Sequence, residues 1–287
     1  MVTTTVPAFL LGALLGAGSA APAKTHAFRV AYQDTTKPEL APLAAKMKER
    51  RVLEGAAEML SALKLPRTLT LKAESCGESN AWYDPQTDVI TFCYELVRDF
   101  VKSAGTSGKF NLTPEQAVVG PFLFIVLHET AHAVFAVLAV PVLGREEDAA
   151  DQVAAYAATQ LGGDFAERML RAAAFMYDTD SSARKPGEDD FADVHGLDRQ
   201  RFYNVLCLAW GSDPKRYAFA KELGKLPDDR AAQKIPPAPT PRANGAASTG
   251  PSASWPGSWC WYCSSADTGP GSTSKACPPP APTTSTA

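Results

Sequence analysis

The sequence predicts an α+β fold, in which a small antiparallel sheet is followed by a mostly helical body. Two observations support this class: short alternating apolar segments gather before residue 94, and helical periodicity dominates after it. The chain has 287 residues, of which 45% are hydrophobic, and so it can bury a sizeable core.

The segment before residue 94 contains the predicted strands. Residues 39–65 have a helical periodicity that ends at Pro66, because proline does not continue a helix. Turn-forming residues over 84–88 separate two apolar segments and predict a hairpin. Cys76 and Cys93 flank this hairpin, and we predict a disulfide between them. The predicted elements are a helix over 39–65 and strands over 68–71, 80–83 and 89–92.

After residue 94 the pattern is that of consecutive helices. Thr113 is the predicted cap of the most apolar helix, and Pro114 occupies its first position, where no amide hydrogen is needed. A break over 141–144 ends this helix, and Gly162-Gly163 closes the next one. The predicted helices cover residues 94–103, 113–140, 145–161, 164–178, 198–210 and 214–223.

The N-terminal segment predicts export from the cytoplasm. Residues 1–23 have no charged side chain, contain an apolar run and end in Ala21-Pro22-Ala23, the small-x-small pattern that signal peptidases prefer. We therefore expect a signal peptide over residues 1–23 and a secreted or periplasmic, extracytoplasmic location. The alternative is an uncleaved anchor. Export would also permit disulfides among the six cysteines.

The composition changes sharply near the C-terminus. Residues 235–287 contain eleven of the 23 prolines and only three charged side chains. Such a segment buries too little apolar surface to offset the entropy that the chain loses on folding. We expect one catalytic domain over residues 24–230, followed by a disordered tail rich in Pro, Ser, Thr and Ala over residues 231–287.

One predicted helix carries a candidate metal site. His128 and His132 are four residues apart, so both imidazoles point from the same face of the helix. Two ring nitrogens can then reach one metal ion, and Glu129 beside them can take a proton from a metal-bound water molecule. The alternative is a core helix with two buried histidines and a paired glutamate.

The next helix begins with three consecutive acids, Glu146, Glu147 and Asp148. Successive helical residues point about 100° apart, so only one of the three can face the histidines. Glu147 has a further acid, Asp151, one turn later on the same face, where it can accept a hydrogen bond from a liganding histidine. We therefore predict Glu147 as the third ligand. The alternative is a solvated acidic face at a helix N-terminus.

The spacing from His128 through Asp151 resembles that of the gluzincin clan of zinc peptidases, in which HExxH is followed by a helix that bears E-x-x-x-D. The resemblance implies a zincin-like helical body with Zn²⁺ bound by His128, His132 and Glu147. It also implies that Glu129 is the catalytic base.

Two further features resemble the gluzincin clan. Asn80-Ala81 is similar to a strand that lies along the cleft of these enzymes and pairs with the substrate backbone. The alternative, which this motif alone favours, is an ordinary edge hairpin. The clan also uses a late histidine, held by an acid, to stabilise the oxyanion. This role would fall to His195 with Asp193, and Tyr203 is a rival donor.

The wider sequence, over residues 28–230, resembles a bacterial family of inferred metallopeptidases, the DUF4344-like family. The resemblance rests on five segments, of which the long one around Gly144 is the most specific. These segments are Asn80-Ala81, Cys93–Leu96, His128–His132, Pro141–Asp151 and Arg201–Asn204.

The predicted function is the hydrolysis of peptide bonds, in a peptide or protein substrate, by a zinc-activated water molecule. One alternative is a non-catalytic module that binds zinc or peptide. An intramembrane metalloprotease is a second alternative, since residues 117–143 are long and apolar, although the polar motif interrupts them. We expect no stable membrane span after signal cleavage. The net charge of −3 argues against nucleic acid as a partner, because phosphate binding needs a basic face.

Overall fold

The computed structural model describes residues 28–183, 185–224 and 226–231. Four strands near the N-terminus precede a helical body, so the α+β class is confirmed. The elements are β1 Arg29–Tyr32, α1 Ala41–Glu49, α2 Val52–Met59, β2 Thr70–Glu74, β3 Ala81–Asp84, β4 Val89–Cys93, α3 Tyr94–Ser103, the 3-10 helix η1 Ala104–Phe110, α4 Gln116–Val137, α5 Glu146–Leu161, α6 Gly163–Ala183, α7 Glu188–Ala192, α8 Asp198–Ser212, α9 Ala218–Gly224 and α10 Asp228–Ala231.

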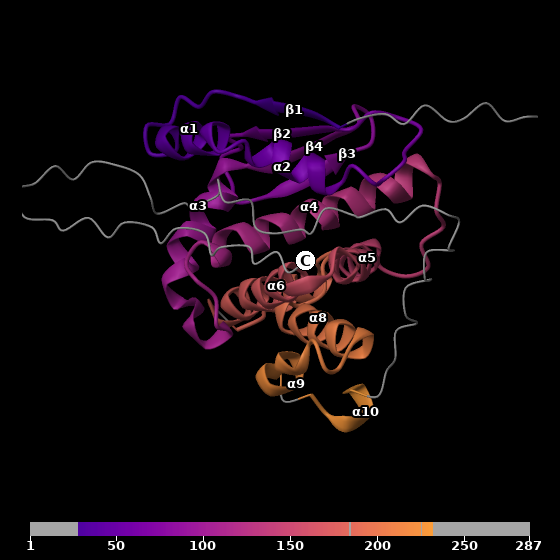
Figure 1. The fold of residues 1–287 in the computed structure, drawn as a ribbon. Coiled ribbons are helices and arrows are strands. Elements are labelled where there is room, and N and C mark those ends of the chain that lie inside the picture. Colours follow the sequence, from indigo (N-terminus) through magenta and orange to yellow (C-terminus); the bar gives the residue numbers. More distant parts are fainter. Residues whose placement is uncertain (1–27, 184, 225, 232–287) are drawn as a thin grey trace, which may run out of the picture.

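The elements are stacked in layers (Figure 1). The sheet and helices α1 and α2 form one side of the molecule, α4 runs beneath the sheet, and α5 and α6 lie below α4. Helix α8 packs against α5 and α6 on the side away from the sheet. Helix α4 is therefore central, and it contacts β3 and β4 as well as α5 and α6.

The four strands form one mixed sheet in the order β1-β2-β4-β3. Strand β1 pairs parallel with β2, and β2 pairs parallel with β4, so only the β3–β4 hairpin is antiparallel. The prediction of an antiparallel sheet is therefore wrong outside the hairpin. Helices α1 and α2 connect β1 to β2 and return the chain to the end where β1 began, as a parallel pair requires. Strand β1 is not among the strands predicted from the sequence.

A break divides the single helix predicted over 39–65 into α1 and α2. Arg51 has φ 54°, in the left-handed region, and it ends the helical path. Tyr32 of β1 stabilises the new start: its hydroxyl accepts a hydrogen bond from Leu53 N and donates one to Glu54, both at 2.8 Å. The break therefore depends on a side chain some twenty residues away in the sequence.

The predicted hairpin and disulfide are both confirmed. Strands β3 and β4 pair around a turn in which Asp84 accepts hydrogen bonds from Gln86 N and Thr87 Oγ1. The sulfurs of Cys76 and Cys93 are bonded, with their Cα atoms 5.4 Å apart. The disulfide ties the loop before β3 to the end of β4, at the junction with α3.

The buried carboxylate of Glu95, at the start of α3, holds the same loop. It accepts hydrogen bonds from Lys37 Nζ at 2.8 Å, Ser75 Oγ at 2.8 Å, Cys76 N at 3.1 Å and Gly77 N at 2.9 Å. Burial opposes the charge on Glu95, but these donors outweigh it and lower its pKa to about 2. The path of the chain into β3 is thus fixed by both a covalent and an ionic connection.

Helix α4 is apolar on every side because the domain surrounds it. Thr113 and Gln116 form the predicted cap, since Gln116 N donates to Thr113 Oγ1 and Thr113 N donates to Gln116 Oε1. Gly120 permits a close approach to α6: a Cβ at this position would lie 2.3 Å from Ala172 Cβ. By length and composition α4 could cross a membrane, but 78% of its most apolar window is buried in the domain.

Two predicted segments fall outside the described residues. These are the signal peptide over residues 1–23 and, apart from Ala231 in α10, the tail over residues 231–287.

Candidate metal centre

Helix α4 directs His128 and His132 of its motif toward α5, and the buried Glu129 lies beside them. His128 and Glu129 are 5% and 6% exposed, and His132 lies one turn later on the same face. The Nε2 atoms of His128 and His132 are 3.2 Å apart. Both ring nitrogens therefore point toward one position between the helices.

Helix α5 brings a carboxylate to that position. The chain turns through Gly144, whose φ of +105° is one that glycine adopts readily, and α5 then starts beside the end of α4. Glu147 Oε2 lies 3.0 Å from His128 Nε2 and 3.4 Å from His132 Nε2. The structure thus brings together the three residues that the sequence predicts as metal ligands.

A third imidazole approaches the same oxygen. His195, in the segment between α7 and α8, has its Nε2 atom 3.0 Å from Glu147 Oε2, and its Nδ1 atom lies 3.0 Å from Asp193 Oδ1. Arg145 NH1 donates to the His195 carbonyl at 3.3 Å and connects this segment to the start of α5. Donor atoms of His128, Glu147 and His195 lie within 4.8 Å of one another, so His195 is within reach of a metal as well as of a substrate.

Asp151 lies on the far side of His128. Its Oδ1 atom is 2.9 Å from His128 Nδ1, and it also accepts a hydrogen bond from the Tyr177 hydroxyl at 2.8 Å. Arg201 binds both carboxylate oxygens, with Nε 2.7 Å from Oδ2 and NH2 2.9 Å from Oδ1. Glu147 and Asp151 therefore hold opposite nitrogens of one imidazole.

Glu146 has a partner that the sequence does not predict. Its side chain is 55% exposed, but Oε1 lies 2.8 Å from His132 Nδ1. The expectation that only one of the three consecutive acids could face the histidines is therefore wrong, because both Glu146 and Glu147 contact them. Each histidine of the α4 motif thus has one ring nitrogen toward Glu147 and the other toward a second carboxylate of α5.

Burial and hydrogen bonding set the charges of this cluster. Burial opposes the charge on Glu147, but contacts with His128, His132 and His195 outweigh it and hold the pKa of its carboxyl well below the usual range. Burial also lowers the pKa of His128, but Asp151 and Glu147 overcome this effect and raise it to about 9. The ionised carboxylates therefore stabilise positive charge at this position. In this structure protonated imidazoles provide that charge, and a bound metal cation would also provide it.

Glu129 has the opposite electrostatic environment. Burial raises the pKa of its carboxyl above the ordinary value, and the nearby imidazoles of His128 and His132 offset this only in part. A carboxyl with a raised pKa is suited to accept a proton and to give it back near neutral pH.

A cleft of about 150 Å³ opens beside the cluster. One wall is the start of β3, where Asn80 and Ala81 lie, and the other contains Glu129 and His195. Strand β3 is at the edge of the sheet, so an extended peptide could pair with it. The remaining described lining residues are Ser79, Leu96, Phe100, Ile125, His128, Met176, Tyr177, Asp180, Asp198 and Arg201.

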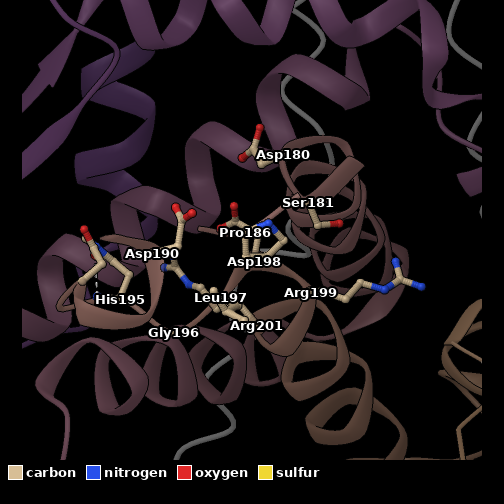
Figure 2. Close-up of a pocket in the computed structure, with 11 residues that line it drawn as sticks. Asp180, Ser181, Pro186, Asp190, His195, Gly196, Leu197, Asp198, Arg199 and Arg201 are labelled. Carbon is tan, nitrogen blue, oxygen red and sulfur yellow. Dashed lines mark hydrogen bonds and ion pairs between the residues drawn. The ribbon is translucent and has the colours of Figure 1, made fainter. Parts of the chain in front are cut away.

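A larger cavity, of about 480 Å³, adjoins the cleft (Figure 2). Asp180, His195, Asp198 and Arg201 line both spaces, so the two lie side by side. Tyr203, the rival oxyanion donor, is not among the described residues that line either space.

Three residues that contact the candidate metal ligands or Asp151 could not be predicted from the local sequence pattern. Nothing in the sequence around Glu146 indicates a contact with a histidine, and its side chain is 55% exposed. Tyr177 is one of many buried residues of helix α6, so the helical pattern does not single it out. Arg201 belongs to one of the segments that carry the family resemblance. The resemblance draws attention to this residue but does not indicate what it contacts.

Comparison with known proteins gives one match. The family model DUF4344, described as "Putative metallopeptidase", matches residues 32–235. No curated protein and no solved structure matches the chain.

Proposed function

The chain belongs to the DUF4344 family of putative metallopeptidases, and on this premise we propose that it is a zinc-dependent peptidase. One observation carries the proposal: donor atoms of His128, His132 and Glu147 converge at separations of 3.0, 3.2 and 3.4 Å. Ligands of a tetrahedral zinc ion, about 2.0–2.1 Å from the metal, lie about 3.3 Å from each other. Imidazole nitrogen and carboxylate oxygen are also usual zinc donors, so the residues fit this ion.

The ion, when bound, would act as a Lewis acid toward water and the peptide carbonyl. The remaining chemistry belongs to the chain. Glu129 accepts a proton from the attacking water molecule and passes it to the leaving nitrogen, which suits a buried carboxyl with a raised pKa.

His195 is the proposed donor to the developing oxyanion. Asp193 lies 3.0 Å from its Nδ1 atom, which leaves Nε2 to face the cleft and the cluster. Asn80 and Ala81 are proposed to pair with the substrate backbone along the edge of β3, which lies in the wall of the same cleft.

A test of the function separates zinc binding from turnover. Glu129→Gln should retain about one zinc ion per chain and lose hydrolysis by roughly 10²–10⁴-fold, because glutamine fills the same space but does not transfer protons. Zinc content by metal analysis and digestion of a broad peptide library would measure the two effects. Glu58→Gln, an exposed change on α2, is the control and should behave as wild type.

One observation favours a second candidate, a non-catalytic zinc-binding module. His195 forms a three-residue donor group with His128 and Glu147, so it could bind the ion and occupy the position that a catalytic zinc site keeps open. If wild type binds zinc tightly and cleaves no member of the library, this candidate replaces the peptidase. Equal turnover in wild type and Glu129→Gln would instead show that Glu129 is not the catalytic base.

We also propose that the protein acts outside the cytoplasm, with a cleaved signal over residues 1–23, a catalytic domain over 24–230 and a tail over 231–287. The Cys76–Cys93 disulfide supports this location, because disulfides persist in oxidising compartments. The burial of α4 in the domain argues against the intramembrane alternative.

A further inference from the structure

Arg201 lies beneath the metal cluster, on the face of α8 that packs against α5. Its side chain is 13% exposed, and its guanidinium binds the buried carboxylate of Asp151 through two parallel hydrogen bonds of 2.7 and 2.9 Å. Among the described residues that line the cleft, Arg201 is the only arginine or lysine.

This bidentate contact fixes the orientation of Asp151. A carboxylate held by one hydrogen bond can rotate, whereas a guanidinium fork holds both oxygens in one plane. Asp151 Oδ1 then faces His128 Nδ1 at 2.9 Å, and the Tyr177 hydroxyl supports the same oxygen at 2.8 Å. Because an ionised carboxylate only accepts hydrogen bonds, His128 Nδ1 donates its hydrogen to Asp151. Nε2, on the side of Glu147, is then the nitrogen that can bind a metal ion once it has lost its own proton.

We propose that Arg201 is a positioning residue for the metal ligand His128, and that it acts through Asp151. The proposal rests on the zinc site of the proposed function. It assigns a role to a residue that touches neither the predicted ligands nor the base, and it explains why an arginine in particular occupies this position. Lysine would supply the charge without the planar fork.

A neighbouring residue offers a matched control. Arg199, also on α8, makes an ion pair through one contact and with a half-exposed side chain, with NH1 2.8 Å from Asp178 Oδ1, and its guanidinium lies over the Phe202 ring. Figure 2 shows Arg199 extending away from His195. If loss of an ion pair between helices were enough to weaken zinc binding, substitution of either arginine would have that effect.

The experiment measures zinc affinity by competition with a chromophoric chelator. Arg201→Lys should bind zinc about tenfold more weakly than wild type, within the range found for partners that orient metal ligands. Arg199→Lys should bind zinc within about twofold of wild type. The visible spectrum of the Co²⁺-loaded protein should shift for Arg201→Lys and not for Arg199→Lys, because only the former moves a ligand.

A double variant removes both partners of the buried ion pair together and is compared with Asp151→Asn alone. Arg201→Met combined with Asp151→Asn should bind zinc as Asp151→Asn does alone, since Arg201 acts only through Asp151. A further loss of more than about threefold in the double variant would overturn the proposal, as would wild-type affinity in Arg201→Lys. If wild-type protein takes up no zinc, the proposed function fails and this inference fails with it.

Discussion

At the scale of single residues, the centre is organised around one carboxylate oxygen. Glu147 Oε2 lies within 3.0–3.4 Å of ring nitrogens from His128, His132 and His195. Glu146 and Asp151 hold the outer nitrogens of the two α4 imidazoles. The three carboxylates therefore have different tasks although all come from the first two turns of α5.

This division predicts a ranking of zinc affinities. Glu147→Ala should weaken zinc binding by more than about 100-fold, because it removes a ligand. Asp151→Ala should cost roughly 10–100-fold and the exposed Glu146→Ala less than about tenfold, because each removes the partner of a ligand. Zinc titration of the three purified variants measures the order. Greater loss in Glu146→Ala or Asp148→Ala than in Glu147→Ala would show that the helical register is wrongly assigned.

At the scale of elements, the sequence pattern predicts those helix boundaries that depend on contacts within the same segment. The sequence places the site helices well, since α4 begins at the cap that Thr113 provides and α5 ends before Gly162. The register of α5 also follows from its own spacing. The division of α1 from α2 does not, because it depends on the Tyr32 hydroxyl of a distant strand.

Contacts between elements explain the remaining differences. Strands β1, β2 and β4 are parallel because each connection brings the chain back to the same end of the sheet. The alternation of apolar and polar residues within a strand carries no information about this path. Tyr177 and Arg201 reach Asp151 only because α6 and α8 both pack against α5. The convergence of His128, His132, Glu147 and Asp151 could thus be predicted from the sequence, but the contacts of Tyr177 and Arg201 with Asp151 could not.

Glu95 gives a prediction at the same scale. Its pKa, about 2 in the folded chain, lies below the usual 4.3–4.5 of an unfolded one, so ionised Glu95 stabilises the fold above that range. The contribution, on the order of 3 kcal/mol, is lost as pH falls from about 4.5 to about 2. Glu95→Gln should therefore be much less stable than wild type at pH 7 and similar to it near pH 2.

Urea unfolding of both proteins at pH 7, 4 and about 2 would measure this convergence. Glu58→Gln, an exposed change, should track wild type at each pH. A stability difference for Glu95→Gln that does not change with pH would mean that the effect comes from packing and not from charge.

At the scale of the whole molecule, the cleft lies where the sheet meets the helices. One wall comes from the edge of β3, which the Cys76–Cys93 disulfide and Glu95 hold in place, and the other from α4, α6 and the start of α8. The lining residues range from Ser79 to Arg201 in the sequence. No single helix pair would reproduce this site, and the proposed activity depends on the complete domain.

The contact between Gly120 and Ala172 restricts which substitutions the family could accept. Any side chain at position 120 would meet Ala172 Cβ at 2.3 Å and push α6 away from α4, and α6 also carries Tyr177. Gly120→Ala should therefore lower the free energy of unfolding by roughly 1–3 kcal/mol, although alanine favours a helix. Adding Ala172→Gly should recover part of this loss, which thermal unfolding of the single and double variants can measure. If the two changes are simply additive, the contact is not tight; if they compensate, positions 120 and 172 can change over evolution only as a pair.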